Sequence, residues 1–169
     1  MYYIYALKRK RMINLIGEYE CRLDAKGRLV LPSALKKQIP QEADERFVIN
    51  RGFEKCLTLF PLNVWRVVSE EVNRLNMYVK MNREFMRFFF RGASELQLDG
   101  ASRLLLPKTL LEYAGIDKDV ILFAHGDRIE VWDKKLYEPQ LQVDSEVYSA
   151  LAEQVMGQVT KQAGQGNVP

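Results

Sequence analysis

Histidine and cysteine are scarce in this chain of 169 residues, which contains one histidine, His125, and two cysteines, Cys21 and Cys56. The two cysteines lie far apart in the sequence and form no CxxC pair, so they predict neither a disulfide framework nor a metal site. We expect plain buried or half-buried thiols and no bound metal. Such sparing use of cysteine favours the reducing environment of the cytoplasm.

The usual catalytic signatures are also missing. The sequence contains no HExxH motif, no P-loop and no nucleophile elbow. Asp24 and Asp99 could serve as paired carboxylates in acid–base chemistry, but each precedes an arginine by four residues within a turn. We interpret them as aspartates that stabilise the turn and orient that arginine. The sequence therefore predicts a protein that is not an enzyme and that uses no cofactor and no small-molecule substrate.

Long apolar runs are absent, and none approaches the roughly 18 residues that a membrane helix needs. Apolar residues make up 47% of the chain and charged residues 28%, as in an ordinary soluble globular protein. The length fits one domain or two small ones. No membrane partner is expected.

Most of the chain carries little excess charge. Taking the four positive charges of the stretch 8–11 (Lys-Arg-Lys-Arg) from the formal net charge of +3 leaves −1 for the remainder. Any basic surface must therefore be local. Residues 1–16 are expected to be a leader outside the fold. Its first eleven residues are either an annotation artefact preceding a true start at Met12 or a solvated, disordered arm.

The strongest signal is an internal repeat. Residues 23–32 (LDAKGRLVLP) return as residues 98–107 (LDGASRLLLP), with Asp24 and Asp99 75 positions apart. Around each copy, the pattern predicts strand, turn, strand, short helix, strand, turn, strand. The two copies are separated by a different segment, so the residues alone favour a tandem pair of small domains.

Segments outside the repeats show helical periodicity. Helices are expected over 61–75 and 82–91 between the copies, and over 134–141 and 144–158 after them, followed by a disordered tail from Thr160 to Pro169. The phenylalanines of 82–91 are expected to belong to the core. Its arginines form either a solvated helix face, which we favour, or a phosphate-facing stripe. The predicted boundaries are 1–16 for the leader, 17–65 and 92–137 for the repeats, 66–91 for the connecting helices, and 138–169 for the C-terminal helix and tail.

Each copy places an arginine directly after a turn. Arg28 and Arg103 would project from a rigid two-stranded ribbon, which fits the major groove of DNA, and a guanidinium fork suits phosphate oxygens or a guanine edge. Lys26 adds a positive charge at the loop tip. An ion pair between each arginine and the aspartate four residues earlier is compatible with this function, because the aspartate can hold the arginine for use.

At these residues the chain resembles the MraZ family of bacterial transcriptional regulators, which belongs to the AbrB-like swapped-hairpin class. The resemblance covers roughly residues 12–141. It rests on the segments 17–20 (GEYE), 23–28 (LDAKGR), 60–65 (FPLNVW), 87–93 (RFFFRGA) and 112–116 (EYAGI).

The resemblance implies an α+β fold, mainly β, in which two tandem swapped-hairpin units pair into one small barrel with connecting helices. It further implies that chains assemble into a homo-oligomeric ring. The protein would bind double-stranded DNA at direct repeats upstream of its own division and cell-wall operon and repress transcription. That activity would place it in the cytoplasm, associated with the nucleoid.

The two copies differ in the basic residues that the resemblance assigns to DNA. Lys36 and Lys37 match a basic pair in AbrB-like hairpins, whereas copy two has Leu111 and Glu112 at those positions. The contribution of that pair is therefore one-sided. Residues 100–102 (GAS) also depart from the Lys-x-Gly spacer of the family's second motif, so a base contact by copy two is less secure than one by copy one. The candidate DNA-binding set comprises Arg22, Asp24, Lys26, Arg28, Lys36, Lys37, Asp99 and Arg103. An antitoxin-like or other protein-interaction module, using the helix after Asp144, is the alternative function.

Overall fold

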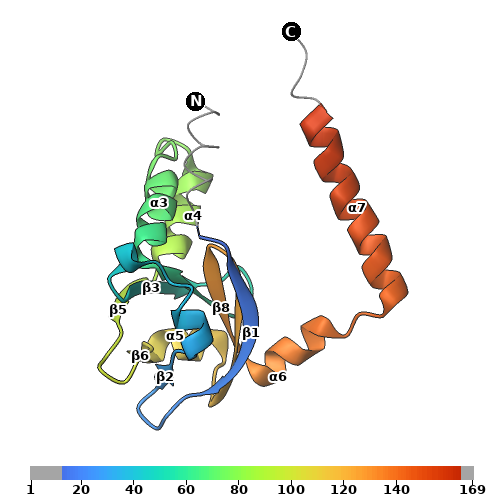
Figure 1. The fold of residues 1–169 in the computed structure, drawn as a ribbon. Coiled ribbons are helices and arrows are strands. Elements are labelled where there is room, and N and C mark those ends of the chain that lie inside the picture. The colour runs from blue at the N-terminus through green and yellow to red at the C-terminus, as the bar shows by residue number, and fades with distance from the viewer. Residues whose placement is uncertain (1–12, 165–169) are drawn as a thin grey trace. The chain divides into compact units, whose positions relative to one another are not determined.

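A computed structural model describes residues 13–164, with side chains to residue 159 (Figure 1). The basic stretch 8–11 lies outside the described residues. The chain divides into two compact units, one ending at Leu136 and one beginning at Tyr137, and we describe each separately.

The predicted order of elements is present in both repeats. The first repeat forms β1 (Leu15–Arg22), β2 (Arg28–Val30), α2 (Ser33–Lys36), η1 (Gln41–Ala43), β3 (Arg46–Arg51) and β4 (Leu57–Pro61). The second forms β5 (Ser94–Gln97), β6 (Arg103–Leu105), α5 (Lys108–Ala114), β7 (Asp119–Gly126) and β8 (Arg128–Asp133). Strand β1 begins two residues before the predicted repeat boundary at position 17, so the end of the expected leader belongs to the fold.

The strands of the two repeats interlock. Strand β1 pairs with β7, and β5 pairs with β3, so the first strand of each repeat is antiparallel to the third strand of the other. The resulting six-stranded sheet has the order β1-β7-β8-β4-β3-β5, and β2 pairs with β6 in a separate ribbon. The expectation of two separate tandem domains was therefore wrong, because neither repeat can complete its pairing alone.

The α+β fold with two interlocked repeats agrees with the swapped-hairpin class. Among the described residues the six-stranded sheet is not closed on itself, since β1 and β5 lie at the two ends of its strand order. The repeats nevertheless share one core, to which equivalent leucines contribute in pairs. These buried pairs are Leu23 and Leu98, Leu29 and Leu104, Leu31 and Leu106, and Leu35 and Leu110.

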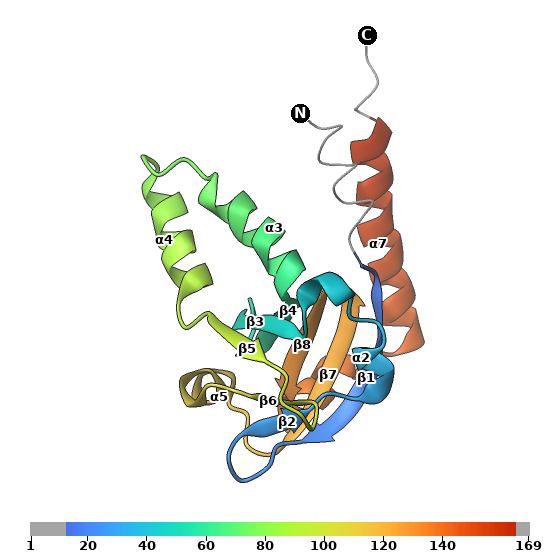
Figure 2. The ribbon, with the colours of Figure 1, turned by 60° about the vertical axis from the view of Figure 1, so that its left-hand side comes forward.

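The connecting segment is a helical hairpin, α3 (Leu62–Asn73) and α4 (Lys80–Phe90), which projects from the sheet (Figure 2). The Phe89 ring stacks on Trp65 with centroids 5.5 Å apart, as the expected apolar faces require. No residue of α4 is buried, however. The expectation that its phenylalanines belong to the core was therefore wrong within a single chain, because α4 has only one of its faces against the protein.

The C-terminal elements differ in two details from the expectation. The helix expected over 134–141 is a short α-helix, α6 (Lys134–Tyr137), followed by a 3₁₀ turn, η2 (Glu138–Leu141). Helix α7 (Ser145–Gly164) continues six residues past 158, so the first half of the tail expected to be disordered is helical. Within the described residues, no helix is both long enough and apolar enough to cross a membrane.

Candidate nucleic-acid interface

The candidate site is the ribbon formed by β2 and β6. Its centre is the pair Leu29 and Leu104, and on either side Arg28 lies opposite Leu105 and Val30 lies opposite Arg103. Because Leu29 and Leu104 are equivalent positions of the two repeats, the ribbon has an approximate two-fold axis between them. The ribbon therefore combines one strand from each repeat.

The first Asp-Arg turn is held by one carboxylate. Asp24 Oδ1 accepts hydrogen bonds from the backbone N–H groups of Lys26 and Arg28, each at 2.9 Å. Asp24 Oδ2 accepts a hydrogen bond from Arg28 Nε at 2.6 Å. The carboxylate thus fixes the turn and the arginine together, as the sequence interpretation required.

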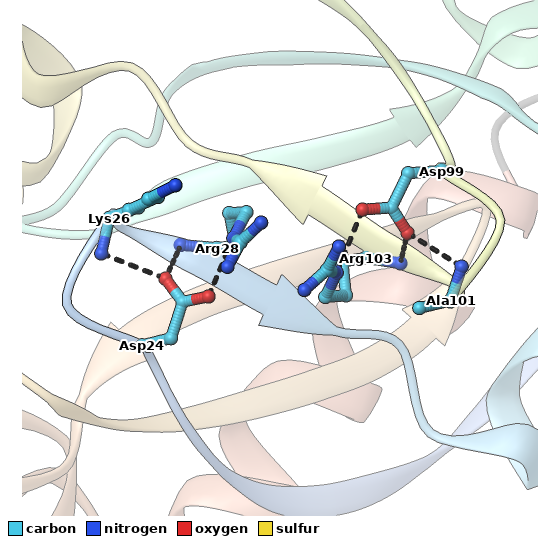
Figure 3. A network of polar contacts seen from close by, with 6 residues as sticks. All are labelled: Asp24, Lys26, Arg28, Asp99, Ala101 and Arg103. Atoms are coloured by element: carbon cyan, nitrogen blue, oxygen red, sulfur yellow. Dashed lines mark hydrogen bonds and ion pairs between the residues drawn. The ribbon is translucent and has the colours of Figure 1, made fainter.

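The second turn repeats this geometry. Asp99 Oδ1 accepts hydrogen bonds from the backbone N–H groups of Ala101 and Arg103, each at 2.9 Å, and Asp99 Oδ2 accepts one from Arg103 Nε at 2.8 Å. In Figure 3 both arginine side chains lie between the two carboxylates, along the ribbon. Two equivalent arginines are therefore presented side by side by a rigid frame.

These hydrogen bonds have an electrostatic consequence. The pKa of Asp24 is lowered, chiefly by the backbone hydrogen bond from Arg28 and also by the Arg28 side chain. The pKa of Asp99 is lowered in the same way by Arg103. Both carboxylates remain ionised at neutral pH, which keeps them as hydrogen-bond acceptors and makes proton exchange at either one unfavourable. This environment suits the orientation of a cation rather than acid–base chemistry.

The turns differ at the residue that adopts a left-handed backbone conformation. In the first turn this residue is Gly27, with φ of 78°, and in the second it is Ser102, with φ of 58°. Gly100, the glycine of the second turn, does not have positive φ. The Asp99 carboxylate therefore holds the second turn although its left-handed position carries a side chain.

A contact between the repeats explains part of the asymmetry. Lys36 Nζ donates a hydrogen bond to Ser102 Oγ at 2.8 Å and lies 3.3 Å from Glu45 Oε1. At the equivalent place, Leu111 lies beside Gly27 and would contact a Cβ atom built there at 3.4 Å. Each short helix thus supports the turn of the other repeat. The sequence pattern alone did not predict this contact, although the shared offset of 75 residues relates Lys36 to Leu111 and Gly27 to Ser102.

The remaining predicted residues, Arg22 and three lysines, differ in whether their charged groups are already engaged by other residues of the chain. Lys26 at the loop tip and Lys37 on the end of α2 are exposed, whereas the Lys36 ammonium group is engaged within the chain. Arg22 ends β1, and its Nε lies 3.8 Å from Asp119 Oδ1 in an exposed pair. Of the predicted lysines, Lys26 and Lys37 are therefore better placed than Lys36 for a phosphate.

Neither cysteine is suited to catalysis. Cys21 is half-buried and Cys56 is buried, and both are free thiols. Burial raises the pKa of Cys56 to about 12, so this thiol stays protonated and unreactive. Among the described residues, no three potential ligands gather as a metal site would require.

Two interlocked hairpin repeats, each with an Asp-held arginine, define an AbrB-like swapped-hairpin protein. The family model described as "MraZ protein, putative antitoxin-like" matches the chain twice, over residues 15–88 and 89–158. The chain belongs to the MraZ family.

Relatives named "Transcriptional regulator MraZ" match most of the chain. The protein from Christiangramia forsetii is 46% identical over 147 residues, covering 86% of this chain and 95% of that protein. The protein from Flavobacterium psychrophilum is 41% identical, covering 88% and 95%. One from Desulfitobacterium hafniense is 36% identical, covering 83% and 96%.

The backbone of the first turn yields a test of this geometry. Gly27→Ala should lower the free energy of unfolding by about 1–2 kcal/mol, because alanine is strained at positive φ. Gly100→Ala is the matched control in the other turn, where a Cβ atom meets nothing within 4 Å, and it should change stability little. Urea unfolding measures both variants. Equal losses would contradict the assignment of the left-handed positions.

The lowered pKa values predict an acid-dependent contribution to stability. Since folding lowers the pKa of Asp24 and Asp99, their stabilisation is fully present above the unfolded pKa of about 3.9 and is lost as pH falls through the folded values. Urea unfolding from about pH 7 to about pH 2 should therefore show a steeper acid loss for the wild type than for Asp24→Asn/Asp99→Asn. If the free energy of unfolding fell with pH equally in the wild type and the double variant, the proposed contribution of the two aspartates would be contradicted.

Proposed function

We propose that this protein is a sequence-specific DNA-binding transcriptional regulator that inserts the β2–β6 ribbon into the major groove. The observation that carries the proposal is the pair of arginines held side by side by Asp24 and Asp99. A two-stranded ribbon has the dimensions to enter the major groove of B-DNA. The names of the relatives point to the same class of function.

The hydrogen bonds leave each arginine suited to recognition. In both pairs the contact to the carboxylate uses Nε, which leaves the outer edge of the guanidinium group to form two parallel hydrogen bonds. The O6 and N7 atoms of guanine accept such a pair in the major groove. An arginine fixed before binding also loses less conformational entropy when it binds.

Exposed lysines near the ribbon would add contacts to phosphates. Lys26 and Lys37 are exposed, and each phosphate contact strengthens binding in a salt-dependent way. Two arginines and a few lysines make a weak site by themselves at physiological salt. Several linked copies can raise the overall affinity by about 10²–10⁴, which supports recognition of repeated sites by an oligomer.

The family resemblance suggests which DNA sites the protein binds and what its binding does to transcription. We propose that the sites are direct repeats upstream of the protein's own division and cell-wall operon, and that occupancy represses transcription. The protein would then act in the cytoplasm on the nucleoid. Binding to DNA from upstream of its own gene tests this assignment directly.

A homo-oligomeric ring is part of the same proposal. Helix α4 has no buried residue and exposes Met81 and Phe88, and nearby Phe53 and Tyr78 are almost fully exposed. Apolar surface of this kind is typical of an interaction site. We propose that neighbouring copies cover it.

A protein-interaction module is the second candidate. It is favoured by α7, which carries Val147, Leu151 and Val155 along one side, all of them exposed. In this candidate, a partner protein binds this side of α7 and the ribbon does not bind DNA. DNA binding by the wild-type chain separates the two candidates.

Loss of one ribbon arginine should weaken specific binding. Arg28→Ala should reduce affinity for the upstream DNA by about 1–3 kcal/mol for each engaged ribbon. Fluorescence anisotropy measures this. Arg74→Ala is the matched control, because Arg74 also pairs with an acidic residue four positions away but lies at the C-terminal end of α3, and it should bind normally. Unchanged affinity in a folded Arg28→Ala protein would contradict the proposal.

The assembly is tested by light scattering after size exclusion. The wild type should have a molar mass several times the 19.7 kDa of one chain, and Phe88→Glu should lower it by placing a charge on the exposed α4 face. Tyr148→Glu, also at an exposed aromatic residue but on α7, is the control. A wild-type monomer at micromolar concentration would contradict the ring.

A further inference from the structure

The outward face of the ribbon carries two apolar side chains that the DNA-binding set does not include. Val30 and Leu105 are 54% and 58% exposed, while the leucines between them, Leu29 and Leu104, are fully buried. Side chains alternate along a strand, so Val30 and Leu105 lie on the same face as the two arginines. The chain thus places aliphatic groups on the surface proposed to enter DNA.

Symmetry distinguishes this pair from a single exposed aliphatic residue. Val30 and Leu105 are equivalent positions, 75 residues apart, two residues after the arginine of each repeat. Each one lies directly opposite the arginine of the other repeat. Both halves of the ribbon therefore present the same combination, an arginine fork with an aliphatic group beside it.

We infer that Val30 and Leu105 are specificity-determining residues that contact the C5-methyl groups of thymines next to the bases bound by Arg28 and Arg103. The inference rests on the proposed function. In the major groove, the thymine methyl is the one apolar group on the base edges, and aliphatic side chains contact it.

The distance between directly opposite side chains on the ribbon is compatible with contacts to adjacent base pairs. Directly opposite residues of an antiparallel pair have Cβ atoms about 4.5–5.5 Å apart, and successive base pairs are about 3.4 Å apart. An arginine on a guanine therefore brings its cross-strand neighbour over an adjacent base pair. The preferred site should contain guanine followed or preceded by thymine, once for each half of the ribbon.

Replacing thymine by uracil removes only the methyl group, so it isolates this contact. The upstream DNA can be amplified with deoxyuridine triphosphate in place of thymidine triphosphate, and binding of both DNAs is measured by anisotropy. The wild type should bind thymine DNA more tightly by about four-fold for each methyl contacted. Val30→Ala/Leu105→Ala should bind the two DNAs nearly alike, whereas Ile16→Ala, at an exposed aliphatic residue of β1, should keep the wild-type ratio.

The outcomes separate this inference from the proposed function. An equal thymine-to-uracil ratio in the wild type and the double variant would overturn the inference, even if Arg28→Ala still loses affinity. Loss of assembly in the double variant would also overturn it, because these side chains would then serve the oligomer. Failure of the wild type to bind either DNA would overturn both proposals. Val30→Ser, which lacks both γ-methyl groups of valine, supplies a second variant and should weaken the preference for thymine.

Discussion

The pairing of β2 with β6 is the contact on which the rest of the molecule depends. It joins the two repeats at Leu29 and Leu104, which are fully buried at the centre of the ribbon. Truncating a leucine at such a position typically costs about 2–5 kcal/mol. The same strands carry Arg28 and Arg103 on the opposite, outward face. The core contact and the proposed DNA-binding surface are therefore two faces of one ribbon, and neither can shift without the other.

Two aspartates convert this ribbon into a binding surface. Each one satisfies two backbone N–H groups of its turn and one nitrogen of its arginine. Because the guanidinium group is fixed at Nε, its position is set before any ligand arrives. The arrangement does not suit acid–base catalysis, since the lowered pKa of each aspartate keeps its carboxylate ionised. The arrangement does suit the recognition of a ligand, because a guanidinium group that is already fixed on a rigid frame loses less conformational entropy on binding.

The sequence predicted the individual strands, turns and helices better than it predicted which strands pair with one another. The repeat, the turns and the role of Asp24 and Asp99 could be read from residue types, because turn chemistry is local. The exchange of β1 and β5 between the repeats could not, because strand pairing depends on contacts between distant segments. The contact from Lys36 to Ser102 was missed for the same reason, and Ser102 also shows that a left-handed turn position need not be glycine. The exposure of α4 could not be foreseen from an apolar pattern that resembles a core helix.

Protection of guanine N7 from methylation by dimethyl sulfate tests the central claim most directly, because N7 lies in the major groove. With DNA from upstream of the gene, the wild type should protect guanines in a regularly repeated pattern. Arg28→Ala/Arg103→Ala should lose that protection while remaining folded. Protection confined to adenine N3, which lies in the minor groove, or an unchanged pattern in the double variant, would contradict recognition by Asp-held arginines of an interlocked ribbon.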